Sequence, residues 1–171
     1  MAEDVIEVMV EVPAGTRNKY AFDEDLGALV LDRQLPSSLV YPADYGFIPR
    51  TLAEDGDALD ALVLLDEPTF PGCIVRMRPL GVLCFVDGDA TDHKIVGVLP
   101  EAADSDGVHD LSDVSSQSLA SIEQFFRVYK DLEEGERIET FGYDDRAAAL
   151  LLIAESRARF ERRSGLSSGQ R

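Results

Sequence analysis

Alternation of apolar and polar residues near the start of the chain constrains its fold most strongly. Between Val5 and Val12 every second residue is aliphatic, and Glu11 is carried on the opposite face. A period of two is typical of a strand with one buried face. Further strand-like runs, separated by turns rich in Gly, Pro and Asp, cover 19–22, 28–33, 61–65, 73–83 and 94–99. Evenly spaced short strands predict a small barrel.

The second half of the chain changes to a helical period. Leu119, Ile122, Phe126 and Tyr129 form one apolar stripe, which predicts a helix over 115–130. A strand at 137–141 and a second helix from 147 to about 163, capped by Asp144, are expected next. We therefore predict one α+β, mainly-β domain over 1–163, followed by a flexible tail at 164–171.

Charge and cysteine content restrict the classes of partner. A formal net charge of −17, from 33 acids against 16 bases, argues against nucleic-acid binding, because phosphate backbones need clustered Lys and Arg. No apolar run approaches the ~20 residues of a membrane helix, and the acidic start lacks the layout of a secretory signal. Cys73 and Cys84 have apolar neighbours and are interpreted as reduced core residues of a cytoplasmic protein rather than as a disulfide.

A glycine-containing turn carries three carboxylates, Asp55, Asp57 and Asp60, directly before an apolar run. Like charges this close repel one another unless a cation lies among them, so the turn suggests a hard metal such as Mg²⁺ and, with it, phosphate chemistry. An EF-hand is rejected, because Asp60 stands where that loop needs glycine. A solvated acidic turn remains the more common interpretation of a bare Asp-Gly-Asp.

A second acidic turn runs from Asp87 to Lys94. Asp92 and Lys94 are two residues apart at a strand start, so they are expected to project to the same face, although such a turn alone is most often a hairpin tip. The chain has only three lysines, Lys19, Lys94 and Lys130, which is either chance or a sign that a compact ammonium is needed at these positions. His93 and His109 lack a histidine partner at metal spacing and are treated as surface residues.

Taken together, these segments resemble the family I soluble inorganic pyrophosphatases of the bacterial type over about 8–160. The resemblance lies in Val-Glu11-Val-Pro-Ala-Gly, Arg17-Asn-Lys19-Tyr20, Leu31-Asp-Arg33, Tyr41-Pro-Ala-Asp-Tyr45-Gly-Phe-Ile, Asp55-Gly-Asp57-Ala-Leu-Asp60, Phe70-Pro-Gly72, Arg78-Pro-Leu-Gly81-Val-Leu, the turn from Asp87 to Lys94, and Phe125-Phe-Arg-Val-Tyr129-Lys130-Asp-Leu-Glu133. It implies an OB-like five-stranded barrel with helices packed outside. It also implies hydrolysis of inorganic pyrophosphate to two phosphates by a metal-activated water.

Roles for individual residues follow from the resemblance alone. Asp57 resembles the group that takes a proton from the attacking water. The metal side is implied to consist of Glu11, Asp55, Asp60, Asp87 and Asp92, and the phosphate clamp of Lys19, Arg33, Tyr41, Tyr45, Lys94, Tyr129 and Lys130. The implied cofactor is Mg²⁺, several ions per active site, with Mn²⁺ or Zn²⁺ as substitutes. The implied assembly is a homohexamer. Charge, hydropathy and cysteine content, rather than the resemblance, predict a cytoplasmic protein with neither nucleic acid nor membrane as a partner.

Some positions depart from the family pattern. Ala21 stands where a Glu is usual and Gly88 where a Glu is frequent, so we expect weaker use of the substrate-side metals unless Asp23 or Asp89 substitutes. Gln124 and Val128 stand where some hexameric relatives have interface histidines. Three alternatives to an active pyrophosphatase stay open: a repurposed member with little hydrolysis, an oligonucleotide-binding barrel, and a calcium-binding module.

Overall fold

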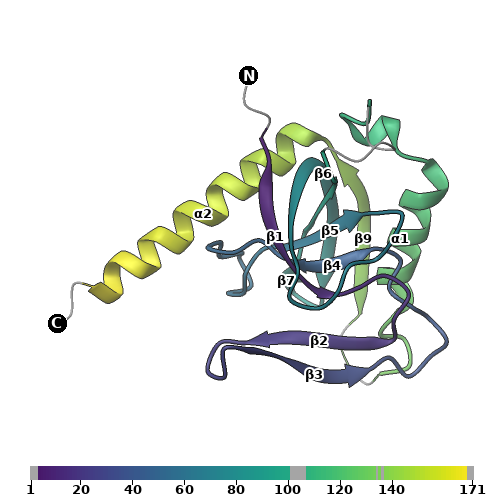
Figure 1. Cartoon of the computed structure of the whole chain (residues 1–171), viewed down its shortest axis with the longest axis horizontal. Helices are drawn as coiled ribbons and strands as arrows, with labels where there is room; N and C mark the ends of the chain where they lie inside the picture. Colours follow the sequence, from purple (N-terminus) through teal and green to yellow (C-terminus); the bar gives the residue numbers. More distant parts are fainter. Residues whose placement is uncertain (1–3, 101–106, 134, 136, 169–171) are drawn as a thin grey trace.

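A ring of strands forms the body of the molecule in the computed structural model, which describes residues 4–168 apart from 101–106, 134 and 136 (Figure 1). The elements, in chain order, are β1 (Ile6–Val12), β2 (Asn18–Asp23), β3 (Ala28–Gln34), β4 (Asp44–Phe47), β5 (Asp60–Leu64), β6 (Ile74–Asp87), β7 (Ala90–Thr91), β8 (Lys94–Val98), the 3₁₀ helix η2 (Leu111–Asp113), α1 (Ser116–Val128), β9 (Ile138–Asp144) and α2 (Arg146–Ser168). Strands pair in the order β1-β4-β5-β8-β6, and β6 pairs again with β1. This closes a ring of five strands and confirms the predicted mainly-β fold with a five-stranded barrel.

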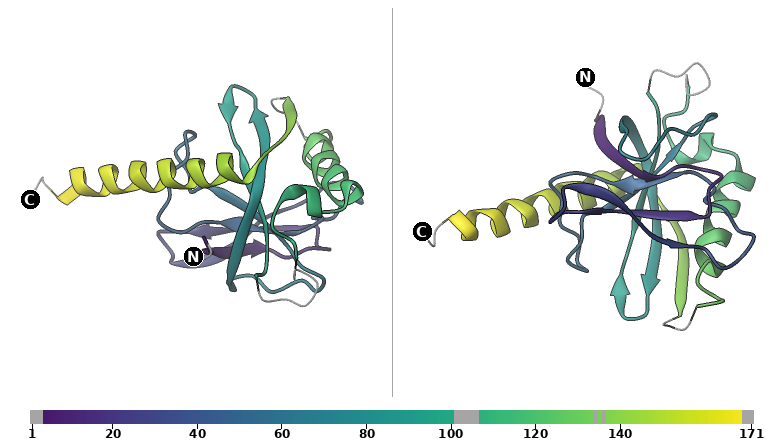
Figure 2. Two further views of the ribbon diagram at one scale, coloured as in Figure 1. Left: turned by 90° about the horizontal axis from the view of Figure 1, so that it is seen from above. Right: turned by 60° about the horizontal axis from the view of Figure 1, so that its bottom comes forward.

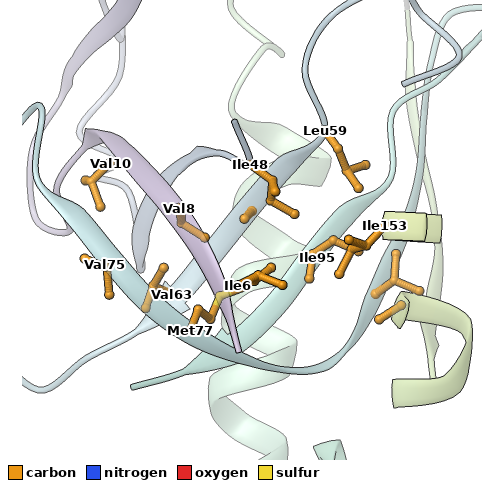
Figure 3. Packing of buried hydrophobic residues seen from close by; sticks show 13 residues of the cluster. Ile6, Val8, Val10, Ile48, Leu59, Val63, Val75, Met77, Ile95 and Ile153 are labelled. Carbon is orange, nitrogen blue, oxygen red and sulfur yellow. The ribbon is translucent and has the colours of Figure 1, made fainter. Parts of the chain in front are cut away.

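Two apolar clusters, one on each face of the central strands, hold the ring together. Along β5, Ala61 and Val63 belong to the cluster that receives Ile153 of α2, whereas Leu62 between them belongs to the cluster under α1. Figure 3 shows the first cluster, with Val63 and Ile153 reaching it from β5 and α2. Because alternate side chains of a strand point to opposite faces, a strand buried on both faces reads as a continuous apolar run.

Close strand packing explains one glycine of the ring. Gly46 of β4 lies opposite Val10 of β1. A Cβ atom at position 46 would come within 1.9 Å of the carbonyl oxygen of Met9, so only glycine allows β1 and β4 to approach this closely.

The β2–β3 hairpin stands apart from the ring as its own two-stranded sheet and lies along the lower edge of the view in Figure 1. Its strands are joined at the 24–27 turn, where Asp23 Oδ1 accepts a hydrogen bond of 2.8 Å from the backbone N–H of Leu26. A buried carboxylate ties the hairpin's entry to the ring, because Asp44 Oδ1 accepts from Ala14 N and Asp44 Oδ2 accepts from Thr69 N and Oγ1. The hairpin can thus present side chains over one end of the ring.

Several predicted boundaries were wrong. The second helix is capped by Asp145 rather than Asp144, because Asp145 Oδ1 accepts from Ala148 N while Asp144 is the last residue of β9. Helix α2 continues to Ser168, five residues past the predicted end at Arg163, and projects away from the ring (Figure 2). The predicted flexible tail therefore begins as helix over 164–168, and 169–171 lie outside the described residues.

Other differences concern the strands and the cysteines. No strand was predicted at β4, and the strand predicted at 73–83 runs on to Asp87. The predicted strand at 137–141 is β9, which begins at Ile138 and ends at Asp144. Cys73 and Cys84 are free thiols, as predicted, but both are only partly buried rather than core residues.

Candidate active site

Two neighbouring parallel strands bring the acidic turns together. Asp60 begins β5, Lys94 begins β8, and the two residues are register partners. Lys94 Nζ lies 2.8 Å from Asp60 Oδ2 and 3.1 Å from Asp92 Oδ2. Carboxylates from turns that are far apart in sequence therefore converge on one ammonium group.

The Lys94 side chain is almost fully buried among aromatic rings. The side chain is 1 % exposed, and Nζ lies 4.7 Å from the ring centroid of Phe85 and 5.2 Å from that of Phe126. Burial by itself lowers the pKa of Lys94, but the adjacent carboxylates of Asp60 and Asp92 outweigh it and leave the pKa raised. The amine is therefore held as a cation.

A second acid–base pair lies at the far end of β6. Asp87, the last residue of β6, forms an ion pair with Lys130, which follows α1. Burial lowers the pKa of Lys130, but the hydrogen bond to Asp87 leads the effects that raise it overall. The end of α1 thereby brings a cation to the acidic edge of the ring.

The β2–β3 hairpin contributes two more cations. Lys19 Nζ lies 3.5 Å from Asp32 Oδ2, and Arg33 Nη1 lies 2.9 Å from Glu133 Oε2, which belongs to the segment after α1. The Nε atom of Arg33 is buried and has no hydrogen-bond partner among the described residues. An anion entering the site would offer Arg33 a partner for this group.

A tight loop presents Asp55 and Asp57. Gly56 between them has φ of +96°, a left-handed conformation that favours glycine, and Asp57 N donates a 3.1 Å hydrogen bond to Asp55 Oδ1. Burial raises the pKa of the Asp55 carboxyl, and the neighbouring charges of Asp57 and Asp60 raise it further. The loop therefore holds carboxylates that extra positive charge would stabilise.

Glu11 lies on the face of β1 opposite Val10 and Val12, as its place in the alternation predicted, and is only partly exposed. Its Oε1 accepts a 2.8 Å hydrogen bond from Phe22 N, which ties β1 to the hairpin. Burial raises the pKa of Glu11 to about 7, although that hydrogen bond opposes the shift. Burial likewise raises the pKa of Asp92, against the lowering effect of Lys94.

Three phenols complete the site. Tyr45 donates a 2.7 Å hydrogen bond to Asp60 Oδ2, and Tyr41 is 1 % exposed. Burial is the main cause that raises the pKa of Tyr41, Tyr45 and Tyr129, so all three hydroxyls stay protonated and able to donate hydrogen bonds near neutral pH.

A cavity of about 570 Å³ joins these groups. The predicted site residues that line it are Lys19, Arg33, Tyr41, Tyr45, Asp55, Asp57, Asp60, Asp87, Asp92, Tyr129 and Lys130. Glu11 and Lys94 do not line it. Lys94 contacts Asp60 and Asp92, which do line it.

The proposed substitutes for missing acids are not in the cavity. Asp23 is engaged in the hairpin turn, and Asp89 is exposed; neither lines the cavity. The structure therefore gives no support to either of them compensating for Ala21 or Gly88. His109 is exposed as predicted, but His93 is only partly exposed, because its Nδ1 accepts from Phe85 N at 3.0 Å.

The sequence did not indicate four residues that line the cavity: Ala90, Phe126, Glu133 and Gly135. Phe126 could have been found, because it lies one helical turn before Tyr129 and Lys130. Glu133 was less easily found: it is the last residue of the segment that contains Lys130 and resembles the family, but nothing in that segment indicated that Glu133 itself would line the cavity.

Within the described part of the chain, no three His, Cys, Asp or Glu side chains are arranged so that they could already hold a metal ion. The ion pairs explain this arrangement, because Lys94 and Lys130 engage oxygen atoms of Asp60, Asp92 and Asp87. The donors themselves are carboxylate oxygens around one cavity, which is the set that Mg²⁺ prefers, so the residues fit this ion in kind.

Comparisons with known proteins agree with this site. The family model of inorganic pyrophosphatase matches residues 8–161. An inorganic pyrophosphatase from Synechocystis is 46 % identical over 151 residues, covering 88 % of this chain and 89 % of that protein. No helix in the described ranges is both long and apolar enough to cross a membrane.

Solved structures show the same fold. The crystal structure of inorganic pyrophosphatase from Thermus thermophilus superposes with a TM-score of 0.90 at 44 % identity, covering 94 % of this chain and 93 % of that one. The structure from Helicobacter pylori gives 0.88 at 34 % identity, with coverages of 93 % and 95 %. The chain therefore belongs to the inorganic pyrophosphatase family and is an enzyme of that family.

Proposed function

We propose that this enzyme hydrolyses inorganic pyrophosphate to two phosphates in a Mg²⁺-dependent reaction, with Mn²⁺ or Zn²⁺ as substitutes. The observation that carries the proposal is the meeting of Asp60 and Asp92 at Lys94 beside a cavity that the other acids and cations line. Carboxylates that attract cations and amines that attract phosphate are both needed for a metal–phosphate substrate.

Glu11, Asp55, Asp60, Asp87 and Asp92 are the residues that would hold the ions. Burial raises the pKa of Glu11, Asp55 and Asp92, so these carboxyls gain from added positive charge. When bound, Mg²⁺ supplies positive charge that neutralises phosphate oxygens and makes an attacking water more acidic. Lys94 and Lys130 would exchange their carboxylate partners for phosphate oxygens in that state.

The cations and phenols would bind and orient the phosphates. Lys19 and Arg33 line the cavity from the hairpin, and Lys130 lines it from the end of α1. Tyr129 and Tyr41 can donate hydrogen bonds without carrying charge, because their pKa values are raised. Fixed donors of this kind lower the barrier when they match the charge of the transition state, by ~3–4 kcal/mol each in comparable sites.

Asp57 is proposed as the general base that takes a proton from the attacking water. It lines the cavity, and the hydrogen bond from its own backbone N–H to Asp55 fixes its place in the loop. General bases contribute roughly 10²–10⁴-fold to rate, so the loss should be large when the base is removed.

Phosphate release from pyrophosphate, with and without Mg²⁺, tests the proposal. Asp57→Asn is expected to lose at least about a hundredfold in kcat, whereas Asp89→Asn, an exposed acid outside the cavity, should stay within about twofold. The function is wrong if the wild-type enzyme releases no phosphate. Weak release that Asp57→Asn leaves unchanged would instead favour the repurposed member that Ala21 and Gly88 suggested.

We further propose a homohexamer located in the cytoplasm. Large apolar side chains on the described surface support association, since Phe70 and Phe141 are each 64 % exposed and Leu151 is 61 % exposed. Light scattering coupled to size-exclusion chromatography measures the mass directly. A monomer at micromolar concentration would contradict the assembly and leave the fold unaffected.

A further inference from the structure

A second cavity, of about 1,090 Å³, lies apart from the candidate active site. It is bordered by β1, the start of β6, the turn after β4, and α2. None of the predicted site residues, all of which the structure describes, lines it. It is nearly twice the volume of the active-site cavity and slightly larger than a usual small-molecule site.

The floor of this cavity is apolar. Ile6, Ile48 and Val75 line it, and they are only 4 %, 1 % and 6 % exposed as members of the first apolar cluster. Figure 3 shows these three side chains coming from β1, the segment after β4, and β6. Such a floor favours an apolar ring or chain over a hydrated ion.

The rim of the cavity is cationic. Arg50, Arg76 and Arg157 line it and are exposed, and the guanidinium group of none of the three forms an ion pair or a hydrogen bond with another described residue. Elsewhere Arg33 and Arg127 each lie 2.9 Å from a carboxylate oxygen. Three unpaired guanidinium groups around one cavity are unexpected in a chain with a net charge of −17.

One acid shares the rim. Glu7 of β1 is the register partner of Arg76 on β6, but the two side chains form no ion pair. The rim therefore carries three positive charges against one negative charge.

Hydrogen bonds between segments fix two of these arginines relative to each other. Leu52 N donates to Ser156 O at 2.9 Å, and Arg159 Nη1 donates to Leu52 O at 2.7 Å. Arg50 lies two residues before Leu52, and Arg157 directly follows Ser156, so both come from segments that are bonded together. Arg50 has φ of +58° and is the one non-glycine with positive φ among the residues that the structure describes. A non-glycine residue whose backbone is held in that conformation depends on its surroundings to stay there.

We propose that this second cavity binds an organic phosphate whose apolar body lies on the floor and whose phosphate groups bind the arginine rim. Guanidinium groups bind phosphate oxygens through paired hydrogen bonds, and several of them suit a diphosphate better than a single charge. The apolar floor distinguishes such a ligand from inorganic phosphate, which has no apolar part. The ligand is either a nucleotide, with an aromatic body, or an isoprenoid diphosphate, with an aliphatic body.

Isothermal titration calorimetry in EDTA tests the proposal, because removal of divalent cations disfavours binding at the active site. The probes are adenosine diphosphate, geranyl diphosphate and inorganic phosphate. At least one of the two organic diphosphates should bind at least about tenfold more tightly than inorganic phosphate, and the tighter of them identifies the body that the floor accepts. No binding of either one, or equal binding of all three, overturns the proposal.

Matched variants locate the binding. Arg157→Gln should weaken binding by about tenfold or more, and Arg76→Gln with Arg157→Gln by about a hundredfold, as expected for lost charged hydrogen bonds. Arg162→Gln removes the same charge from an exposed site on the same helix that does not line the cavity, and should change binding less than twofold. Lys130→Gln should also leave binding unchanged. Equal effects of Arg157→Gln and Arg162→Gln, or loss of binding in Lys130→Gln, would assign the ligand to another place and overturn the inference.

Discussion

Asp60 and Lys94 are register partners on parallel strands, and their side chains meet with Nζ 2.8 Å from Oδ2. This relationship links the fold to the chemistry, because parallel β5 and β8 place their first residues at one edge of the ring. Asp92 joins them from the turn just before β8. The strand pairing therefore brings Asp60 to the buried cation of Lys94, and the turn before β8 adds Asp92 as a second acid.

Replacing Lys94 with methionine should destabilise the metal-free protein. The Lys94 side chain is 1 % exposed, and its removal leaves Asp60 and Asp92 close together without their shared counter-charge. Breaking such a buried pair costs about 3 kcal/mol in free energy of unfolding. Urea denaturation in EDTA at pH 7.5 measures the change. Lys130→Met is the control, because its side chain is 28 % exposed and a more exposed pair is worth ~1 kcal/mol or less; equal losses in both variants would contradict the prediction.

Most residues that line the active-site cavity were named from the sequence, and a few were not. Residue type and spacing within one turn were enough to single out the acids at 55–60. The roles expected for these acids and for the three lysines came only from the family resemblance. Glu133 was missed, since its contact with Arg33 spans 100 residues and joins the hairpin to the segment after α1. The cationic rim was missed for the same reason: Arg50, Arg76 and Arg157 come together only in the folded chain.

The predicted boundaries of two elements were wrong because strand pairing or the continuation of a helix determines where these elements begin and end. Asp144 and Asp145 are equally good caps by residue type, and the pairing of Asp144 with Val82 of β6 assigns the cap to Asp145. Ser164 and Gly165 are poor helix formers, which suggested an earlier end to α2. A helix already anchored by Ile153 adds further turns without a new nucleation cost, and one interior glycine costs only ~1 kcal/mol.

Asp44 is predicted to stabilise the fold without taking part in catalysis. Its buried carboxylate accepts hydrogen bonds from Ala14 N, Thr69 N and Thr69 Oγ1. Asp44→Asn removes the charge and one acceptor, and should lower the free energy of unfolding by about 2 kcal/mol. Thermal and urea denaturation measure the loss, and kcat of the folded fraction should stay within about twofold. Asp25→Asn, at the exposed hairpin turn, serves as the control and should change stability by less than ~0.5 kcal/mol.

Cys84 should react slowly with alkylating reagents at neutral pH. Burial raises its pKa to about 11, and the adjacent Asp144 carboxylate, 3.3 Å from Sγ, adds to the shift. Because the thiolate is the nucleophile, its fraction and the alkylation rate should rise about tenfold per pH unit and level off only above pH 11. Mass spectrometry after timed exposure to iodoacetamide, in a Cys73→Ser background, follows this rate. Asp144→Asn should move the profile to lower pH, and an unchanged profile would show that Asp144 has no part in the shift.

Glu133 is predicted to compete with substrate for Arg33. The two groups are 2.9 Å apart in an ion pair at the cavity wall, and this pair must open before Arg33 can bind a phosphate. Glu133→Gln removes the competing charge, which for a partly exposed pair corresponds to ~0.2–1 kcal/mol. We therefore expect KM for pyrophosphate to fall about threefold with little change in kcat. Steady-state phosphate release measures both constants, with Glu139→Gln, an exposed acid outside this cavity, as the control; a raised KM would mean that Glu133 positions Arg33 instead.

Placing an acid at position 21 should raise the affinity of the substrate-side metal site for Mg²⁺. Ala21 is two residues along β2 from Lys19, which lines the cavity, so the two side chains share a face of the strand. Asp23 cannot substitute while its carboxylate caps the hairpin turn at Leu26. Ala21→Glu should therefore move the Mg²⁺ optimum of phosphate release several-fold lower, because an added carboxylate raises affinity for a divalent cation. Leu31→Glu adds the same charge to an exposed position on the other face of the hairpin and should leave the optimum unchanged. If Ala21→Glu alters neither the optimum nor turnover, the enzyme does not use this position for a metal.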